Sequence, residues 1–221
     1  MTHPDWSDVG DRLQRLTRAP FPTAILGSQL HHWRLEPPLS PADLADLEDQ
    51  LQVDLPDDYR SFLLQAGRGG AGPAYGLFPV RRINGRWQWE GDGADLTGLD
   101  TLSQPFPHVA AFNPAEGLPE PPAPADFTSP EAYEAAEEEY WKHHDAVAFD
   151  PEHSIGLLYL SHLGCALRHA LVITGPARGH MWSDETADDN GYRPLHSADG
   201  TALTFTRWYR DWLDTVAPPK P

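Results

Sequence analysis

The stretch 53–80, VDLPDDYRSFLLQAGRGGAGPAYGLFPV, constrains the fold more than any other part of the sequence. Pro56 suits the first position of a helix, because its missing N–H would have no partner there. Tyr59 and Phe62 begin a series of apolar residues at i, i+3, i+4 and i+7, so this helix buries one face. The stretch therefore predicts a core helix, then a chain reversal, then an apolar strand at 75–80.

The reversal is a glycine-rich turn, RGGAGP at 68–73. Gly67 before it suits the left-handed residue that ends many helices. The turn resembles a phosphate cradle only in composition, because it follows a helix and lacks the GK[ST] sequence. We predict a tight helix-to-strand connection, and a backbone lip on a binding cleft is the alternative.

Further helix signals lie on both sides of this stretch. A short helix is predicted over 4–18, with Arg12 on a solvated basic edge. Ser40 and Ser129 each precede a proline and an apolar series, as helix caps do. Thr204 is a third predicted cap, and the apolar residues that follow it at helical spacing are Phe205, Trp208, Tyr209, Trp212, Leu213 and Val216. This wide aromatic stripe predicts a helix packed across a sheet.

Short apolar runs separated by turn residues predict the strands. They lie at 30–35, 146–149, 155–160, 170–174 and 180–183. Short connections join antiparallel neighbours. We therefore predict an α+β fold with a central, mainly antiparallel sheet of about five strands and helices packed on it.

The chain is predicted to be a single domain, 1–221, with a core at about 35–216. An N-terminal helical extension covers 1–22, and an irregular, proline-rich insertion covers 81–128. The insertion begins with a hairpin around Asn84-Gly85, the best tight-turn pair. Its proline-rich part is expected to lie extended over the surface.

Several blocks of the sequence resemble the Smi–Knr group of the SUKH superfamily. The first is LPDDYRSFLLQAGRGGAGPAYGL, and Gly164-Cys165, LVITGPARGHMWSD (171–184) and TFTRWYRDWLD (204–214) follow in the same order. The resemblance covers about 35–216, with a weaker middle. The residues that match the family motifs are Pro56, Tyr59, Phe62, Gly69, Gly70, Gly72, Tyr75, Gly76, Gly164, Cys165, Gly175, Trp182, Asp184, Phe205, Trp208 and Trp212.

This resemblance implies a compact α+β domain without catalytic chemistry. Many bacterial members are cytoplasmic immunity proteins that bind and neutralise a toxin domain. A fungal relative regulates the cell wall, so the fold is a binding platform and does not fix the partner.

The charge of the chain points to a basic partner. The formal net charge is −17, which disfavours nucleic acid because phosphates would be repelled. Residues 113–152 contain eleven acids and one lysine, and such a cluster can steer a cationic protein to its surface. The candidate partner-binding residues are Glu131, Glu134, Glu137, Glu138, Glu139 and Asp145. The helix predicted after Ser129 has an acidic side, Glu134, Glu137, Glu138 and Glu139, and an apolar side, Tyr133, Ala136, Tyr140 and Trp141. A merely solvated helix face is the alternative.

The residues with catalytic potential form no recognised motif. Cys165 is the single cysteine, and we expect it to be buried like most free cysteines. The histidines include no HExxH, so no metal and no cofactor are predicted. A metal-assisted hydrolase using His31, His143 and a carboxylate stays open as the alternative. Asp184 is a possible acid whose expected role is to close a turn, and Trp182 is expected in the core.

The N-terminal sequence MTHPDWSDVGDRLQRL lacks the pattern of a secretory signal, and no window approaches about 20 apolar residues. We therefore expect a cytoplasmic protein. The leading hypothesis is a non-enzymatic immunity protein that neutralises a basic toxin domain, for example a nuclease. The metal-assisted hydrolase and a regulatory scaffold are the alternatives.

Overall fold

A computed structural model describes residues 4–18 and 27–219. Its α-helices are α1 (Val9–Thr17), α2 (Ser28–His31), α3 (Pro41–Leu51), α4 (Asp57–Gln65), α5 (Pro130–Ala148) and α6 (Phe205–Val216). Its strands are β1 (Val80–Ile83), β2 (Arg86–Trp89), β3 (Leu157–Gly164), β4 (Leu167–Val172), β5 (Met181–Asp184) and β6 (Tyr192–Pro194). The predicted α+β class is confirmed.

The main sheet is antiparallel, in the order β3-β4-β5-β6. The strands β1 and β2 pair with each other as the predicted hairpin around Asn84-Gly85. The prediction of a regular strand at 75–80 is wrong. The segment still lies along β3, because the Tyr75 and Phe78 N–H groups donate backbone hydrogen bonds to it. Gly76 has a φ of 97° and Pro79 has no N–H to donate, so a regular ladder cannot continue along this segment.

An aromatic cluster from distant parts of the chain joins α4 to α6. The Phe62 ring lies 5.1 Å from Trp6, 5.2 Å from Phe205 and 4.8 Å from Tyr209. Ser61 accepts a hydrogen bond of 2.9 Å from the Trp6 indole N–H. α6 packs on α4 through Phe205, and its Trp208 indole N–H donates to His169 of β4 at 3.2 Å, so the predicted helix forms and contacts the main sheet at this point.

The predicted N-terminal helix begins later than expected, at Val9, and residues 1–3 and 19–22 of the predicted extension lie outside the described residues. Arg12 is 4% exposed, so its predicted place on a solvated edge is wrong. Its guanidinium donates to the Ala217 carbonyl at 2.7 Å and to the Asp214 carboxylate at 2.6 Å. Arg12 therefore ties α1 to the end of α6, and these partners offset its desolvation.

Two other predicted strands do not form. In the segment 30–35, the short helix α2 ends at His31, and His32 and Trp33 then take positive φ angles of 48° and 58°. The run 146–149 is the last turn of α5 and its C-cap. There the Phe149 N–H donates to the Asp145 carbonyl at 3.0 Å, because the alanine-rich sequence continues the helix.

The central stretch forms its predicted helix with two local differences. Pro56 is the N-cap, one position before the predicted one, and α4 starts at Asp57. Gly67 lies outside the left-handed region that was predicted for it. A Cβ at Gly67 would lie 2.6 Å from the Glu36 carbonyl oxygen, so this glycine permits close backbone packing.

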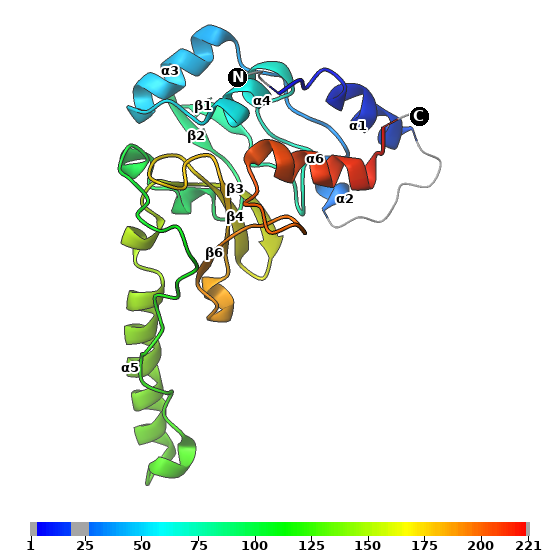
Figure 1. Cartoon of the computed structure of the whole chain (residues 1–221). Coiled ribbons are helices and arrows are strands. Elements are labelled where there is room, and N and C mark those ends of the chain that lie inside the picture. Colours follow the sequence, from blue (N-terminus) through cyan, green and yellow to red (C-terminus); the bar gives the residue numbers. More distant parts are fainter. Residues whose placement is uncertain (1–3, 19–26, 220–221) are drawn as a thin grey trace.

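One long helix projects from the rest of the chain. In Figure 1, α5 and the extended segment before it run side by side, away from the sheet and the other helices. We call residues 113–148 the arm and the other described residues the body. The proline-rich connection was expected to lie over the surface, but from Asn113 it follows the arm.

Candidate protein-binding surface

The arm is built on α5, which is 19 residues long and therefore about 28 Å from end to end. Ser129 caps it by accepting a hydrogen bond of 3.2 Å from the Ala132 N–H. The buried residues of α5 are His144 and Ala148, both in its last two turns. Most of the helix is thus accessible on the side that does not face the extended segment.

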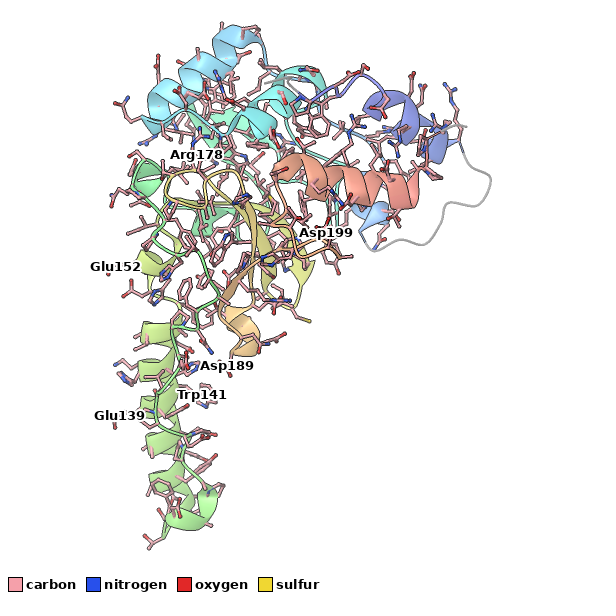
Figure 2. All side chains as sticks on the ribbon, viewed as in Figure 1. Glu139, Trp141, Glu152, Arg178, Asp189 and Asp199 are labelled. Atoms are coloured by element: carbon pink, nitrogen blue, oxygen red, sulfur yellow. The ribbon has the colours of Figure 1, made fainter. Side chains whose placement is uncertain are left out.

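The arm has two halves, α5 and the extended segment before it. Contacts between these halves, and contacts of both with the body, hold the arm in place. The Phe127 and Tyr133 rings pack edge to face at 5.8 Å. At the base, Asp189 of the body meets both halves: His144 Nε2 lies 3.2 Å from its carboxylate, and Asn113 donates to its carbonyl at 2.5 Å. Figure 2 shows Asp189 where the arm meets the body. The arm therefore leaves the body at one small junction.

The candidate acids of the arm do not share one face. Glu131, Glu134, Glu138, Glu139 and Asp145 are exposed, whereas Glu137 is half-buried. Glu137 accepts a hydrogen bond of 2.6 Å from the Tyr133 hydroxyl, and this bond raises the pKa of Tyr133.

Four residues of α5 form what we call the acidic stripe: Glu134, Glu138, Trp141 and Asp145. Their spacing of i, i+4, i+7 and i+11 places them on one side of the helix. Trp141 is 41% exposed. Figure 2 shows Trp141 and Glu139 on opposite sides of α5. The stripe thus combines three carboxylates with an exposed aromatic ring.

A cavity of about 540 Å³ opens where α5 ends. Its apolar wall includes Leu96, Phe149 and Ile155, and its deep side includes the polar residues Tyr159, Asp184 and Tyr192. The Leu96 and Phe149 side chains are 46% and 53% exposed. The volume falls within the range of about 300–1,000 Å³ that is usual for ligand sites.

Hydrogen bonds fix the buried carboxylate in the cavity. The Tyr159 hydroxyl donates to one Asp184 oxygen at 2.7 Å, and the Thr186 N–H and hydroxyl donate to the other at 3.1 and 2.7 Å. The bonds from Thr186 confirm that Asp184 closes the turn, as expected. Burial raises the pKa of Tyr159 well above its usual value and that of Tyr192 to about 12, so both phenols keep their protons.

The cavity was not predicted. Asp184 was noted as a possible acid, but Tyr159 and Tyr192 lie 25 and 8 residues away along the chain and carry no local signal. Strand pairing brings them together, because β4 pairs with both β3 and β5, and β5 pairs with β6.

The catalytic candidates are not gathered in one place. Cys165 is exposed, which corrects its expected burial, because Cys165 and Ala166 form the tight turn between β3 and β4 with φ angles of 49° and 59°. The His31 ring contacts Trp33 at 5.2 Å, whereas His143 is exposed on α5. Within 4–18 and 27–219, no group of three or more His, Cys, Asp or Glu side chains could hold a metal ion.

Most residues that match the family motifs build the body. Tyr59, Phe62, Trp182, Phe205 and Trp208 are buried, and Trp182 is a core residue as expected. The glycines at 69, 70, 76, 164 and 175 have positive φ angles. The glycine-rich turn is a structural connection, in which Gly70 bridges Leu35 and Leu77.

The family model of the SMI1 / KNR4 family (SUKH-1) matches residues 38–165, more than half of the chain. The chain belongs to the SMI1/KNR4 family. The matched region of this SUKH-1 chain includes α3, α4, the hairpin, the whole arm and β3. The resemblance in blocks 171–184 and 204–214 lies beyond it.

Comparisons with curated proteins and with solved structures gave no match. Of the helices in the described part of this SUKH-1 chain, none has the length and apolar character needed to cross a bilayer.

Proposed function

We propose that this SUKH-1 chain is a non-enzymatic immunity protein that binds and neutralises a basic toxin domain, for example a nuclease, in the cytoplasm. The arm supports this proposal more than any other feature. It holds an exposed acidic stripe about 17 Å long, away from the residues that keep the body folded.

The charge distribution favours a cationic partner. Residues 113–152 contribute −10 of the net −17, although they are less than a fifth of the chain. Such a concentrated field speeds the encounter with a positively charged protein, and salt weakens this effect.

Trp141 would supply binding energy after the encounter. An aromatic ring that is 41% exposed on a charged helix can be buried by a partner, and buried tryptophans are frequent energetic centres of interfaces. The exposed carboxylates around it give orientation and rate, because rim charges contribute more to steering than to affinity.

The two alternatives have less support. A hydrolase using His31, His143 and a carboxylate would need these groups in one cleft, yet His31 packs against Trp33 and Trp212 while His143 lies on the arm. A regulatory scaffold would use the same arm and would differ in the identity of its partner.

The experiment begins with crosslinking the tagged chain in cells that carry it naturally and identifying the captured protein. The captured protein is then expressed with and without the chain. We expect it to be toxic alone and harmless with the chain. A captured protein that is not toxic would favour the regulatory scaffold, and turnover of a small compound by the pure chain would favour the hydrolase.

A charge-matched pair of variants tests the role of the arm. The triple variant Glu134→Gln, Glu138→Gln, Asp145→Asn removes three charges from the stripe. The control Asp11→Asn, Asp49→Asn, Asp54→Asn removes three exposed charges from the body. We expect about tenfold or more weaker binding for the first and about twofold or less for the second. Equal losses, or binding that is insensitive to salt, would contradict docking on the arm.

A further inference from the structure

The acidic stripe leads into the cavity. Phe149 follows Asp145 by one helical turn. The Phe149 N–H donates a hydrogen bond to the Asp145 carbonyl, so the chain still follows the path of α5 at Phe149. The chain then turns, and Pro151 and Ile155 continue the cavity wall. A partner lying along the stripe would therefore reach the mouth of the cavity.

The deep side of the cavity offers hydrogen-bond acceptors. Asp184 is 6% exposed, and its carboxylate, which can accept about four hydrogen bonds, receives three from Tyr159 and Thr186. Tyr192 contributes a second phenol oxygen, 3.4 Å from that of Tyr159. A buried carboxylate next to phenol oxygens is suited to a group with several N–H donors.

The charge of the lining also favours a cation. Asp95, Asp150 and Glu152 join Asp184 in the lining, and Arg168 carries the single positive charge among the lining residues. The Arg168 guanidinium already donates to the Ala166 carbonyl at 2.6 Å and lies 3.8 Å from the Asp92 carboxylate. An anionic ligand would therefore meet a net excess of carboxylates.

We propose that this cavity takes up one arginine side chain of the basic partner, with its guanidinium toward Asp184 and its aliphatic part along Leu96 and Ile155. The proposal rests on the proposed function and assigns a specific anchor to it. Arginine fits better than lysine, because its planar group has five donors and can stack on the exposed Phe149 ring.

The polar and apolar parts of the cavity together favour this occupant. A purely apolar side chain would leave the deep carboxylate without a new partner, at a desolvation cost. An arginine covers the apolar wall with its methylene groups and keeps its charge beside the carboxylate, as long cationic side chains do at mixed surfaces.

The test uses two blocked tripeptides on the isolated chain: acetyl-Gly-Arg-Gly-amide and its citrulline counterpart, which has nearly the same shape and no charge. Amide chemical shifts are followed by NMR during titration. We expect the arginine peptide to shift the signals of Leu96, Phe149 and Ile155 saturably. The citrulline peptide should bind more weakly by about tenfold or more, because it cannot form a charge-assisted hydrogen bond.

Three variants locate the binding. Phe149→Ala removes an exposed wall residue without opening the core, and Asp184→Asn removes the buried charge at constant size; both should weaken arginine-peptide binding by about fivefold or more. Glu139→Gln, on the far side of α5 from the stripe, should leave it unchanged. Thermal unfolding identifies any variant that does not fold. If Asp184→Asn does not fold, the binding measured with Phe149→Ala decides the test.

Several outcomes would overturn the anchor. They are equal binding of the two peptides, no saturable shift with either, shifts confined to the arm, or full binding by Phe149→Ala. Because no partner protein is used, these failures are separate from a failed toxicity rescue. A bound arginine peptide together with a failed rescue would keep the anchor and remove the immunity role.

Discussion

The body and the arm are stabilised in different ways. In the body, rings from distant parts of the chain pack within about 5–6 Å of one another, and Phe62 and Tyr209 are fully buried. In the arm, a helix of 19 residues has two buried residues and depends on its cap, its alanines and the contacts of one extended segment.

This difference places much of the negative charge away from the residues that stabilise the fold. Carboxylates repel one another and are costly to bury, so a body that carried all of them would lose stability. The arm carries nine acids and one lysine, so −8 of the net −17 lies between 113 and 148, where eight of the nine carboxylates are exposed to water. The comparison suggests that the arm can change its charges without affecting the core, and three predictions test it.

The largest effect should come from removing a phenylalanine ring inside the body, compared with removing one where the body meets the arm. Phe62→Ala empties a fully buried site and should lower the free energy of unfolding by about 3–5 kcal/mol. Phe149→Ala, at the base of the arm and 53% exposed, should change it by about 0.5 kcal/mol. Chemical denaturation followed by circular dichroism measures both. Similar losses would mean that the base of the arm belongs to the core.

Acid should destabilise the body through a half-buried histidine. His169 accepts a hydrogen bond of 3.2 Å from the Trp208 indole, and burial lowers its pKa from 6.5 to about 4. Between these values the unfolded chain binds more protons than the folded chain, so stability falls as the pH drops from about 6.5 to 4. Burial also lowers the pKa of His31 to about 4, with the same sign.

Urea midpoints at pH 7, 5.5 and 4.5 measure this dependence. His169→Gln should reduce the loss between pH 7 and 4.5, because the amide does not titrate. His143→Gln, on the exposed side of the arm, should follow the original chain. A midpoint that stays constant over this pH range would contradict the role assigned to His169.

The smallest effect on stability should follow excision of the arm. Both halves of the arm meet Asp189, so replacing 117–141 with a short Gly-Ser linker keeps the junction at Asn113 and His144. The free energy of unfolding should change by about 1 kcal/mol or less, because closing a shorter loop costs little. Binding to the basic partner should be lost. Unfolding of the shortened chain would show that the arm supports the body.

Local signals identified much of the fold. Ser40, Ser129 and Thr204 cap helices as predicted, and Asn84-Gly85 makes the hairpin. These features depend on residues within one or two turns of the chain, so the sequence contains nearly all the information they need. The strand predictions at 30–35 and 146–149 failed because short apolar runs suit either a helix or a strand.

The candidate site was predicted less well. The sequence located the acidic helix and most of its exposed carboxylates. It placed Trp141 on the apolar side, and it treated Glu137 and Glu139 as neighbours of Glu134 on one face. The extended segment packs on the side of Tyr133, and this packing decides which residues of α5 remain accessible.

Composition, caps and motifs are local properties, and they suffice to predict the α+β class, the SUKH-1 membership and the concentration of negative charge near α5. Three features appear only in the folded chain: α5 leaves the body, Cys165 is exposed, and Tyr159, Asp184 and Tyr192 line one cavity. Each of these depends on contacts between residues far apart in the chain, such as the pairing of strands and the junction at Asp189. Their geometry is fixed when the whole chain packs.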